Sequence, residues 1–471
     1  MVFSSLPFLF RFLPAVLALY YVVPDAWKNT VLLFGSLIFY CWGEIRFFPI
    51  LLAVVLINYG CGLLLEWTAE KPALKKLTLI FGIAASLSFL LYFKYSAFIG
   101  SVFGIKNTSG LIWRGTLPLG ISFYTFQAMS YVIDLYRKKA PMEKNIITFG
   151  SYIIMFPQLI AGPIVKYVTI HAQLRNPSKR VTIDRLETGA KLFVLGLAQK
   201  VLLADGIGKL WSDIIGVYQN GMMTQAGVGL ENASTGLAWL GIAAYSMQLY
   251  FDFNGYSMMG IGLGKMLGFD FPDNFKHPYI SGSITEFWRR WHITLSGWFR
   301  DYVYIPLGGN KVGKKKQLRN LLIVWLLTGI WHGAGWNFIA WGLFYFLLLL
   351  IEKLWLLPYL KKGKIWPHIY TLVLVVFGWG LFVSGEKGVG LGLLLDRLFC
   401  FRSGVSVLYF LRNYGVILTI SVLCCTSLPE KCWSWMEKHQ TVQIAALGIL
   451  LVTSVCYLVG TTNSPFLYFN F

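Results

Sequence analysis

Two histidines in the middle of the chain are the residues best placed to do chemistry. His332 interrupts a long apolar run within Gly329–Trp336, and His292 ends the aromatic and basic segment Glu286–His292. An ionisable side chain in a run apolar enough to enter a membrane is costly, so its presence indicates a function. A neutral imidazole can take a proton from a hydroxyl group near neutral pH, which predicts that His332 is a general base.

Two other interpretations of His332 compete with this one. It could be a histidine whose hydrogen bonds are satisfied inside a protein core. It could also bind a metal, but the positions three and four residues away hold Thr328, Gly329, Gly335 and Trp336, none of which is a metal ligand. No metal site is therefore expected.

The segment before His292 carries a possible binding function. Arg289 and Arg290 could bind phosphate groups, because guanidinium groups match phosphate oxygens in geometry and charge. If the segment is helical, Trp288 and His292 share one face and the two arginines point elsewhere. The alternative is an aromatic and basic anchor at the membrane interface.

Two further polar residues are candidates for the same site. Asp252 is a lone acid near the end of an apolar span, where it could pair with an arginine or assist a histidine. Asn337 could orient a ligand carbonyl or bond a neighbouring helix. We expect Trp288, Arg289, Arg290, Asp252 and Asn337 to contribute to ligand binding, and His332 and His292 to catalysis.

Composition places the chain in a membrane. Of its 471 residues, 56% are hydrophobic and only 13% are charged, whereas soluble proteins carry about 25% charged residues. Apolar runs long enough to span a bilayer recur along the chain, which predicts an all-α polytopic membrane protein with residues 1–471 in one domain. The net charge of +20 falls mostly in loops between apolar runs, as the positive-inside bias predicts, so nucleic acid is not an expected partner.

The predicted membrane segments alternate with basic loops. The predicted spans are 7–23, 30–43, 47–65, 77–98, 117–135, 192–215, 235–252, 366–384, 406–428 and 441–459. The loop charges place the N-terminus on the external side. Residues 146–165 are apolar but flanked by basic loops on both sides, which predicts a broken or re-entrant helix, with a proline-kinked span as the alternative. Residues 255–320 are expected to form amphipathic helices on the cytoplasmic face.

The apolar run 321–351 is too long for one span. As a single helix its 31 residues would measure about 46 Å, against a hydrocarbon core of about 30 Å. Basic residues flank it on both sides, so an even number of crossings is expected. The run is therefore predicted to be two short helices joined at Gly333–Gly335, which places His332 within the membrane profile.

A set of motifs in a fixed order gives the chain a family resemblance. The motifs are Phe156–Pro163, Tyr250–Ser257, Pro272–Phe275, Glu286–His292, Ile305–Asn310, Trp331–Asn337 and Ser464–Phe469. Together they resemble the membrane-bound O-acyltransferase family, and most closely its bacterial alginate and peptidoglycan O-acetyltransferase branch. Met258 and Tyr345 depart from that branch, where an acid and a histidine are common.

The resemblance implies a funnel-shaped bundle of about 11–12 transmembrane helices with re-entrant and amphipathic helices, in the bacterial cytoplasmic membrane. It implies no permanently bound cofactor, acetyl-CoA as acyl donor, contact with membrane lipids, and a partner protein or polysaccharide outside the cytoplasm as acceptor. His332 matches the family's catalytic histidine and His292 its second histidine. The alternatives are D-alanyl transfer from a carrier protein and transport of a lipid-linked saccharide.

Overall fold

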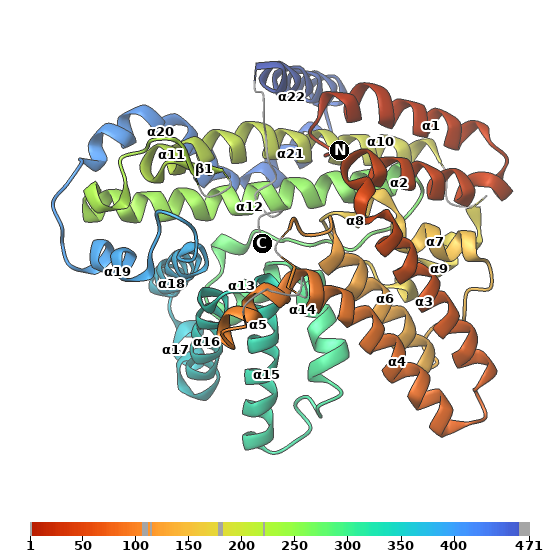
Figure 1. Cartoon of the computed structure of the whole chain (residues 1–471). Helices are drawn as coiled ribbons and strands as arrows, with labels where there is room; N and C mark the ends of the chain where they lie inside the picture. The colour runs from red at the N-terminus through yellow and green to blue at the C-terminus, as the bar shows by residue number, and fades with distance from the viewer. Residues whose placement is uncertain (1, 106–111, 114, 178–181, 220–221, 461–471) are drawn as a thin grey trace. The chain divides into compact units, whose positions relative to one another are not determined.

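The protein is almost entirely helical, as the computed structural model in Figure 1 shows. The structure describes residues 2–105, 112–113, 115–177, 182–219 and 222–460. Within these residues the only sheet is an antiparallel pair of short strands, β1 (Val217–Gln219) and β2 (Met222–Gln225). The predicted all-α class is confirmed. The motif Ser464–Phe469 lies outside the described residues.

The chain divides into two compact units. The first comprises Met1–Leu197 with Tyr256–Asp273, and the second Ala198–Gly255 with Asn274–Phe471. The expectation of one domain over residues 1–471 stays a prediction.

The first unit is built from apolar helices of unequal length. They are η1 (Phe8–Phe12), α1 (Leu13–Val22), η2 (Asp25–Trp27), α2 (Lys28–Glu44), η3 (Ile45–Phe47), α3 (Phe48–Trp67), α4 (Pro72–Leu90), η4 (Leu91–Tyr95), α5 (Ser96–Val102), α6 (Ile121–Tyr136), α7 (Ile146–Ile154), α8 (Phe156–Leu159), α9 (Tyr167–Arg175) and α10 (Ile183–Ala198).

The predicted break within residues 146–165 is present. Helix α7 ends at Ile154 and α8 begins at Phe156, with Pro157 in its first turn. A proline removes one backbone donor and cannot continue the preceding helix. The backbone N–H of Phe156 donates instead to the Ser36 hydroxyl at 3.0 Å, so the interruption leaves this group satisfied inside the protein.

The second unit contains the residues around both histidines. Its helices are η6 (Gln199–Ala204), α11 (Asp205–Ile215), η7 (Leu230–Asn232), η8 (Pro278–Ile280), α13 (Ile284–Arg290), α14 (Ile293–Phe299), η9 (Arg300–Tyr304), α15 (Lys314–His332), α16 (Trp336–Ile351), η10 (Glu352–Leu356), α17 (Leu357–Lys362), α18 (Trp366–Val383), α19 (Leu391–Phe399), α20 (Val407–Cys424), α21 (Leu428–Met436) and α22 (Gln440–Gly460). The long α12 (Thr235–Met266) contributes residues 235–255 to this unit and residues 256–266 to the first. Helix α12 continues beyond the predicted 235–252 span to Met266, and the span itself stays a prediction.

The predicted helical hairpin is confirmed. Helices α15 and α16 lie side by side and meet at Gly333–Gly335, with His332 as the last residue of α15. Two glycines allow the helices to approach closely. A Cβ at Gly342 would lie 2.5 Å from the Trp325 carbonyl oxygen, and one at Gly329 would collide with the Phe338 carbonyl oxygen. This close packing fixes where the hairpin ends, and therefore where His332 is placed.

Within the described residues, six helical segments are long and apolar enough to cross a membrane. They are Asp25–Trp67, Pro72–Val102, Trp336–Lys362, Trp366–Val383, Val407–Cys424 and Gln440–Gly460, and Phe8–Val22 is a shorter apolar segment. The polytopic membrane class is therefore supported by the helices themselves.

Candidate active site

Both histidines line one cavity of about 260 Å³ in the second unit. Its walls come from α13, α14 and the hairpin of α15 and α16, and its lining includes Trp288, Arg289, Arg300 and Thr328 beside the two imidazoles. His292 and His332 are separated by 39 intervening positions in the sequence, so the fold has to bring them together. The predicted association of the two histidines is thus present in the structure.

His332 lies among aromatic rings at the end of α15. It is 4% exposed, and its ring centroid lies 5.0 Å from that of Trp331, 5.0 Å from that of Trp341 and 5.3 Å from that of Phe382. All three rings are edge-on to the imidazole, an arrangement that aromatic pairs favour. The side chain is therefore held in place by packing on several sides while it still lines the cavity.

His292 is fixed by hydrogen bonding and by its backbone. Its φ of 43° lies in the left-handed region, and its side chain is 1% exposed. The Asn274 Oδ1 lies 3.0 Å from the His292 Nδ1 and also accepts from the Thr294 hydroxyl at 2.8 Å and from the Thr294 backbone N–H at 3.4 Å. A backbone N–H can only donate, so Oδ1 is the acceptor and Nδ1 carries the proton. Nε2 is then the ring nitrogen that can accept a hydrogen bond.

Burial keeps His292 neutral. Its desolvation lowers the pKa of His292 to about 3, because the charged imidazolium would lose its hydration. The imidazole packs edge-on against Phe253 at 4.8 Å and lies 5.9 Å from the Trp331 ring, which is also adjacent to His332. One indole thus contacts both histidines.

The predicted helical face shared by Trp288 and His292 is wrong. Helix α13 ends at Arg290, and the left-handed backbone at His292 redirects the chain before α14 begins. Trp288 and His292 nevertheless line the same cavity, and so does Arg289, which was expected to point elsewhere. The turn, not a helical repeat, brings these side chains together.

The structure separates the two neighbouring arginines. Arg289 is exposed and lines the cavity, and no carboxylate in the described part of the chain pairs with it. The Arg290 guanidinium instead pairs with Glu286 at 2.7 Å and donates to the Lys276 carbonyl at 3.3 Å. Arg300, which sequence reasoning did not select, also lines the cavity and pairs with Asp301 at 2.8 Å. The cavity therefore has two buried imidazoles inside, of which His292 is neutral, and exposed guanidinium groups at its edge.

A buried carboxylate joins the hairpin to the start of α13. Glu352 is fully buried, and its carboxylate accepts from the backbone N–H groups of Ile284 at 2.6 Å and Thr285 at 2.8 Å, and from the Thr285 hydroxyl at 2.6 Å. The Ser283 hydroxyl, which is the N-cap, accepts from the Glu286 backbone N–H at 3.0 Å. Glu352 thereby sets the position of α13, which carries Trp288 and Arg289, relative to α16.

Asp252 and Asn337 make structural contacts away from the cavity lining. Asp252 lies 3.0 Å from the Lys200 Nζ, which also binds Asp205 at 2.5 Å, and both Asp252 and Lys200 are buried. The expected pairing of Asp252 with an arginine is replaced by this ion cluster. The Asn337 side chain donates to the Phe382 carbonyl of α18 at 2.7 Å, the neighbouring-helix alternative. It lines a separate cavity beside Ser384 and Gly385.

Sequence reasoning missed two residues that position the site, Asn274 and Glu352, and the buried Lys200 outside its lining. Asn274 lies in a recognisable motif but has no charge to draw attention. Glu352 and Lys200 are charged residues next to or inside apolar segments, and this unusual placement could have identified them as candidates. Their partners are distant in sequence, so their roles could not be assigned without the fold.

Comparisons with known proteins show what the chain is similar to. A model of the membrane-bound O-acyltransferase family matches residues 37–385. The chain is 42% identical over 409 residues to a probable alginate O-acetylase of Pseudomonas syringae, covering 85% of this chain and 76% of that protein. It is 29% identical over 537 residues to a peptidoglycan O-acetyltransferase of Helicobacter pylori, covering 100% and 98%. A teichoic acid D-alanyltransferase of Streptococcus thermophilus is 32% identical over 247 residues, which cover 50% of this chain and 57% of that protein.

Proposed function

Because the chain belongs to the membrane-bound O-acyltransferase family and is an acyltransferase acting on hydroxyl groups, we propose that it transfers acetyl groups from acetyl-CoA. The acceptor is a hydroxyl group of a polysaccharide outside the cytoplasm, or of a partner protein that passes the acetyl group on. The similarity to two polysaccharide O-acetyltransferases over most of the chain supports this choice. The bacterial relatives and the apolar helices support a multi-pass membrane protein. We propose that it lies in the cytoplasmic membrane with its N-terminus external, the orientation that the loop charges favour.

The observation that carries the proposal is the shared cavity of His292 and His332. His332 accepts the proton of the acceptor hydroxyl as its oxygen attacks the thioester carbonyl. The new carbon–oxygen bond forms, the carbon–sulfur bond breaks, and the proton passes from His332 to the departing CoA thiolate. His292, neutral and oriented by Asn274, supplies an acceptor at Nε2 that positions the acceptor hydroxyl or the donor.

Donor binding is assigned to the edge of the cavity. Arg289 and Arg300 are exposed guanidinium groups on its lining, and the phosphates of acetyl-CoA are anionic. Trp288 also lines the cavity, and its buried indole N–H has no hydrogen-bond partner among the described residues. An N–H in that position can donate to a polar group of the bound donor. Arg290, held by Glu286, contributes to the basic surface beside the cavity.

The test is His332→Ala in membranes supplied with acetyl-CoA and either alginate or peptidoglycan. Release of the CoA thiol and acetyl incorporation should fall about a thousandfold, as expected when a general base is removed. His368→Ala is the matched control, because His368 is exposed on α18 and does not line the cavity. A His332→Ala protein that inserts normally and keeps full transfer would contradict the assignment.

A second donor class is tested in the same assay. The similarity to a teichoic acid D-alanyltransferase over half of the chain favours including an aminoacylated carrier protein as donor. We expect transfer from acetyl-CoA and none from the carrier. The opposite result would replace acetyl transfer with aminoacyl transfer at the same histidines.

A further inference from the structure

A second cavity, in the first unit, is lined by lysines. It has a volume of about 410 Å³ and lies between the end of α3, the start of α4 and the loop that follows α6. Lys75, Lys138 and Lys139 line it, together with one acid, Glu66. The Glu66 carboxylate lies 3.7 Å from the Lys144 Nζ, so its charge is already partly compensated from outside the lining. This lysine pocket therefore has an excess of positive charge.

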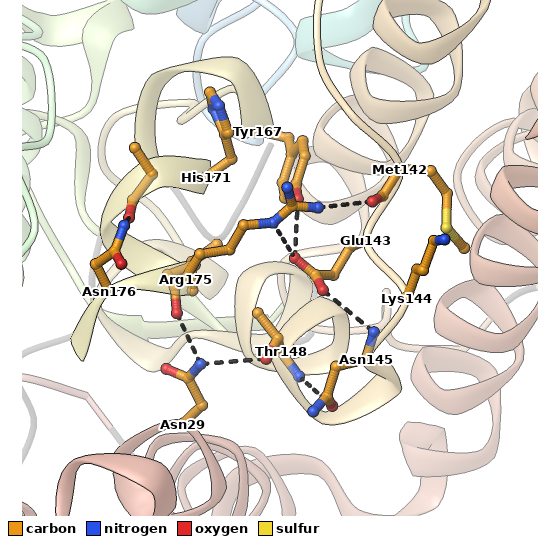
Figure 2. Close-up of polar contacts among 12 residues, drawn as sticks. Asn29, Met142, Glu143, Lys144, Asn145, Thr148, Tyr167, His171, Arg175 and Asn176 are labelled. Carbon is orange, nitrogen blue, oxygen red and sulfur yellow. Dashed lines mark hydrogen bonds and ion pairs between the residues drawn. The ribbon is translucent and has the colours of Figure 1, made fainter.

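The loop that carries two of these lysines is held rigidly. Figure 2 shows the buried Glu143 carboxylate accepting from the Arg175 Nε at 3.1 Å, the Tyr167 hydroxyl at 3.1 Å and the Asn145 backbone N–H at 3.1 Å. Arg175 also donates to the Met142 carbonyl at 2.6 Å. The ion pair between Glu143 and Arg175 thus anchors the loop. A basic loop whose lysines were only solvated would not need such an anchor.

Lys138 has an unfavourable backbone conformation. Its φ is 57°, in the left-handed region where glycine usually ends a helix. The Lys138 N–H donates to the Leu135 carbonyl at 3.0 Å and the Lys139 N–H to the Asp134 carbonyl at 2.9 Å, so this conformation terminates α6. A lysine there costs stability compared with glycine, and strain of this kind points to a use for the side chain.

The ends of two candidate membrane segments flank the pocket. It is formed where two candidate membrane segments, Asp25–Trp67 and Pro72–Val102, meet in sequence. Trp67 is 71% exposed at the end of the first, and Lys75 lies 5.1 Å from the Tyr136 ring centroid. Exposed tryptophan and tyrosine at span ends are typical of the headgroup region.

We propose that the lysine pocket binds the phosphate headgroup of an anionic phospholipid. Three lysines on a rigid frame supply point charges for the phosphate, and the adjoining apolar helices α3 and α4 can contact the acyl chains. A soluble phosphate would use the same charges but gain nothing from those helices. A lipid headgroup and a soluble phosphate would contact the same lysines, and we assign the pocket to the lipid.

Native mass spectrometry of the full chain in detergent tests this. Phosphatidylglycerol should remain bound more than phosphatidylethanolamine, and the triple substitution of Lys75, Lys138 and Lys139 to Ala should reduce its retention at least about fivefold, because the charges that hold the phosphate are removed. The matched control replaces Lys361, Lys362 and Lys364, three exposed lysines of the second unit, with Ala. Equal loss in both triple variants would show a general charge effect and overturn the site.

Two further experiments test whether the bound phosphate belongs to a lipid and whether the strained backbone at Lys138 serves lipid binding. Inorganic phosphate at millimolar concentration should not displace the lipid, and displacement would overturn a membrane source. Lys138→Gly should raise the thermal stability of the lipid-free protein while it weakens retention of phosphatidylglycerol, because it relieves the left-handed strain and removes the charge. Unchanged retention in Lys138→Gly and in the triple variant would overturn the proposal even if both proteins fold normally.

Discussion

The histidine cavity and the lysine pocket look alike in the sequence but differ in the structure. Both come from short basic segments next to apolar helices. In the first, the guanidinium groups of Arg289 and Arg300 lie at the edge and the interior holds buried imidazoles among aromatic rings. In the second, the lysines form the walls. A site for proton transfer needs a desolvated group of adjustable protonation, whereas a site for an anion needs fixed charge, and only the fold distinguishes the two.

The two regions are also stabilised in the same way. Each is held by a buried carboxylate that does not line the cavity: Glu352 binds the start of α13, and Glu143 binds the loop after α6. Hydrogen bonds to a charged group contribute about 1.5–3 kcal/mol each, so a single carboxylate can fix a segment that packing alone would leave loose. The two regions therefore differ in function because the fixed segments carry different side chains, Trp288 and Arg289 on α13 and lysines on the loop after α6.

The largest effect that tests this comparison is expected from Glu352→Ala. The change leaves the Ile284 and Thr285 N–H groups without their acceptor and releases α13 with Trp288 and Arg289. Turnover should fall about a hundredfold, equivalent to about 2.7 kcal/mol of the barrier, while retention of phosphatidylglycerol is unchanged. Glu143→Ala should lower the retention of phosphatidylglycerol and leave turnover unchanged. Acetyl transfer assays and native mass spectrometry on both variants check this, and a Glu352→Ala protein with normal turnover would show that α13 does not need the carboxylate.

A smaller effect, visible only in acid, is expected from Asn274→Asp. The new carboxylate can still accept from His292 and Thr294, but it favours the imidazolium and raises the pKa of His292 from about 3. Protonation then turns Nε2 from acceptor to donor at a higher pH than in the wild type. Turnover should stay within about threefold at pH 8 and fall about tenfold near pH 5, where the wild type keeps a neutral His292.

The control for this change is Asn274→Ala, which removes the acceptor without adding charge. It should lower turnover at every pH and leave the shape of the pH profile unaltered. If Asn274→Asp shows no new acid limb between pH 8 and pH 5, then the protonation state of His292 does not matter for the reaction.

The local features of this fold could be predicted from the sequence. The hairpin, with His332 at its turn, could be predicted from the basic residues on both sides of 321–351 and from the glycines at Gly333–Gly335. Helix length and flanking charge are local properties of the sequence. The broken helix near Pro157 followed in the same way. The end of α12 was missed because Asp252, which should terminate an apolar span, is neutralised by Lys200, a contact invisible in the sequence.

The candidate site was predictable in its residue types but not in its geometry. His292 and His332 stood out by type and surroundings, but the helical face that Trp288 and His292 were expected to share is absent, because α13 ends at Arg290. The His292 imidazole, which follows a left-handed turn of the backbone, is held by Asn274 from outside the motif, and Thr294 donates to the same Asn274 oxygen. Long-range hydrogen bonds of this kind, and that of Glu352 to α13, leave no periodic pattern to read.

The smallest effect, and the one that sharpens the comparison most directly, separates the two adjacent arginines. Arg289→Ala should raise the KM for acetyl-CoA about tenfold with little change in kcat, because an exposed guanidinium at the cavity edge acts on donor binding and not on proton transfer. Arg290→Ala should change KM less than about twofold, since its partners are Glu286 and the Lys276 carbonyl and their surface pairing contributes about 0–1 kcal/mol. High salt should reduce the Arg289 effect, as expected for an exposed charge. Equal KM changes in the two variants would mean that the donor is attracted by the basic surface as a whole, which would make the edge of the histidine cavity resemble the lysine pocket after all.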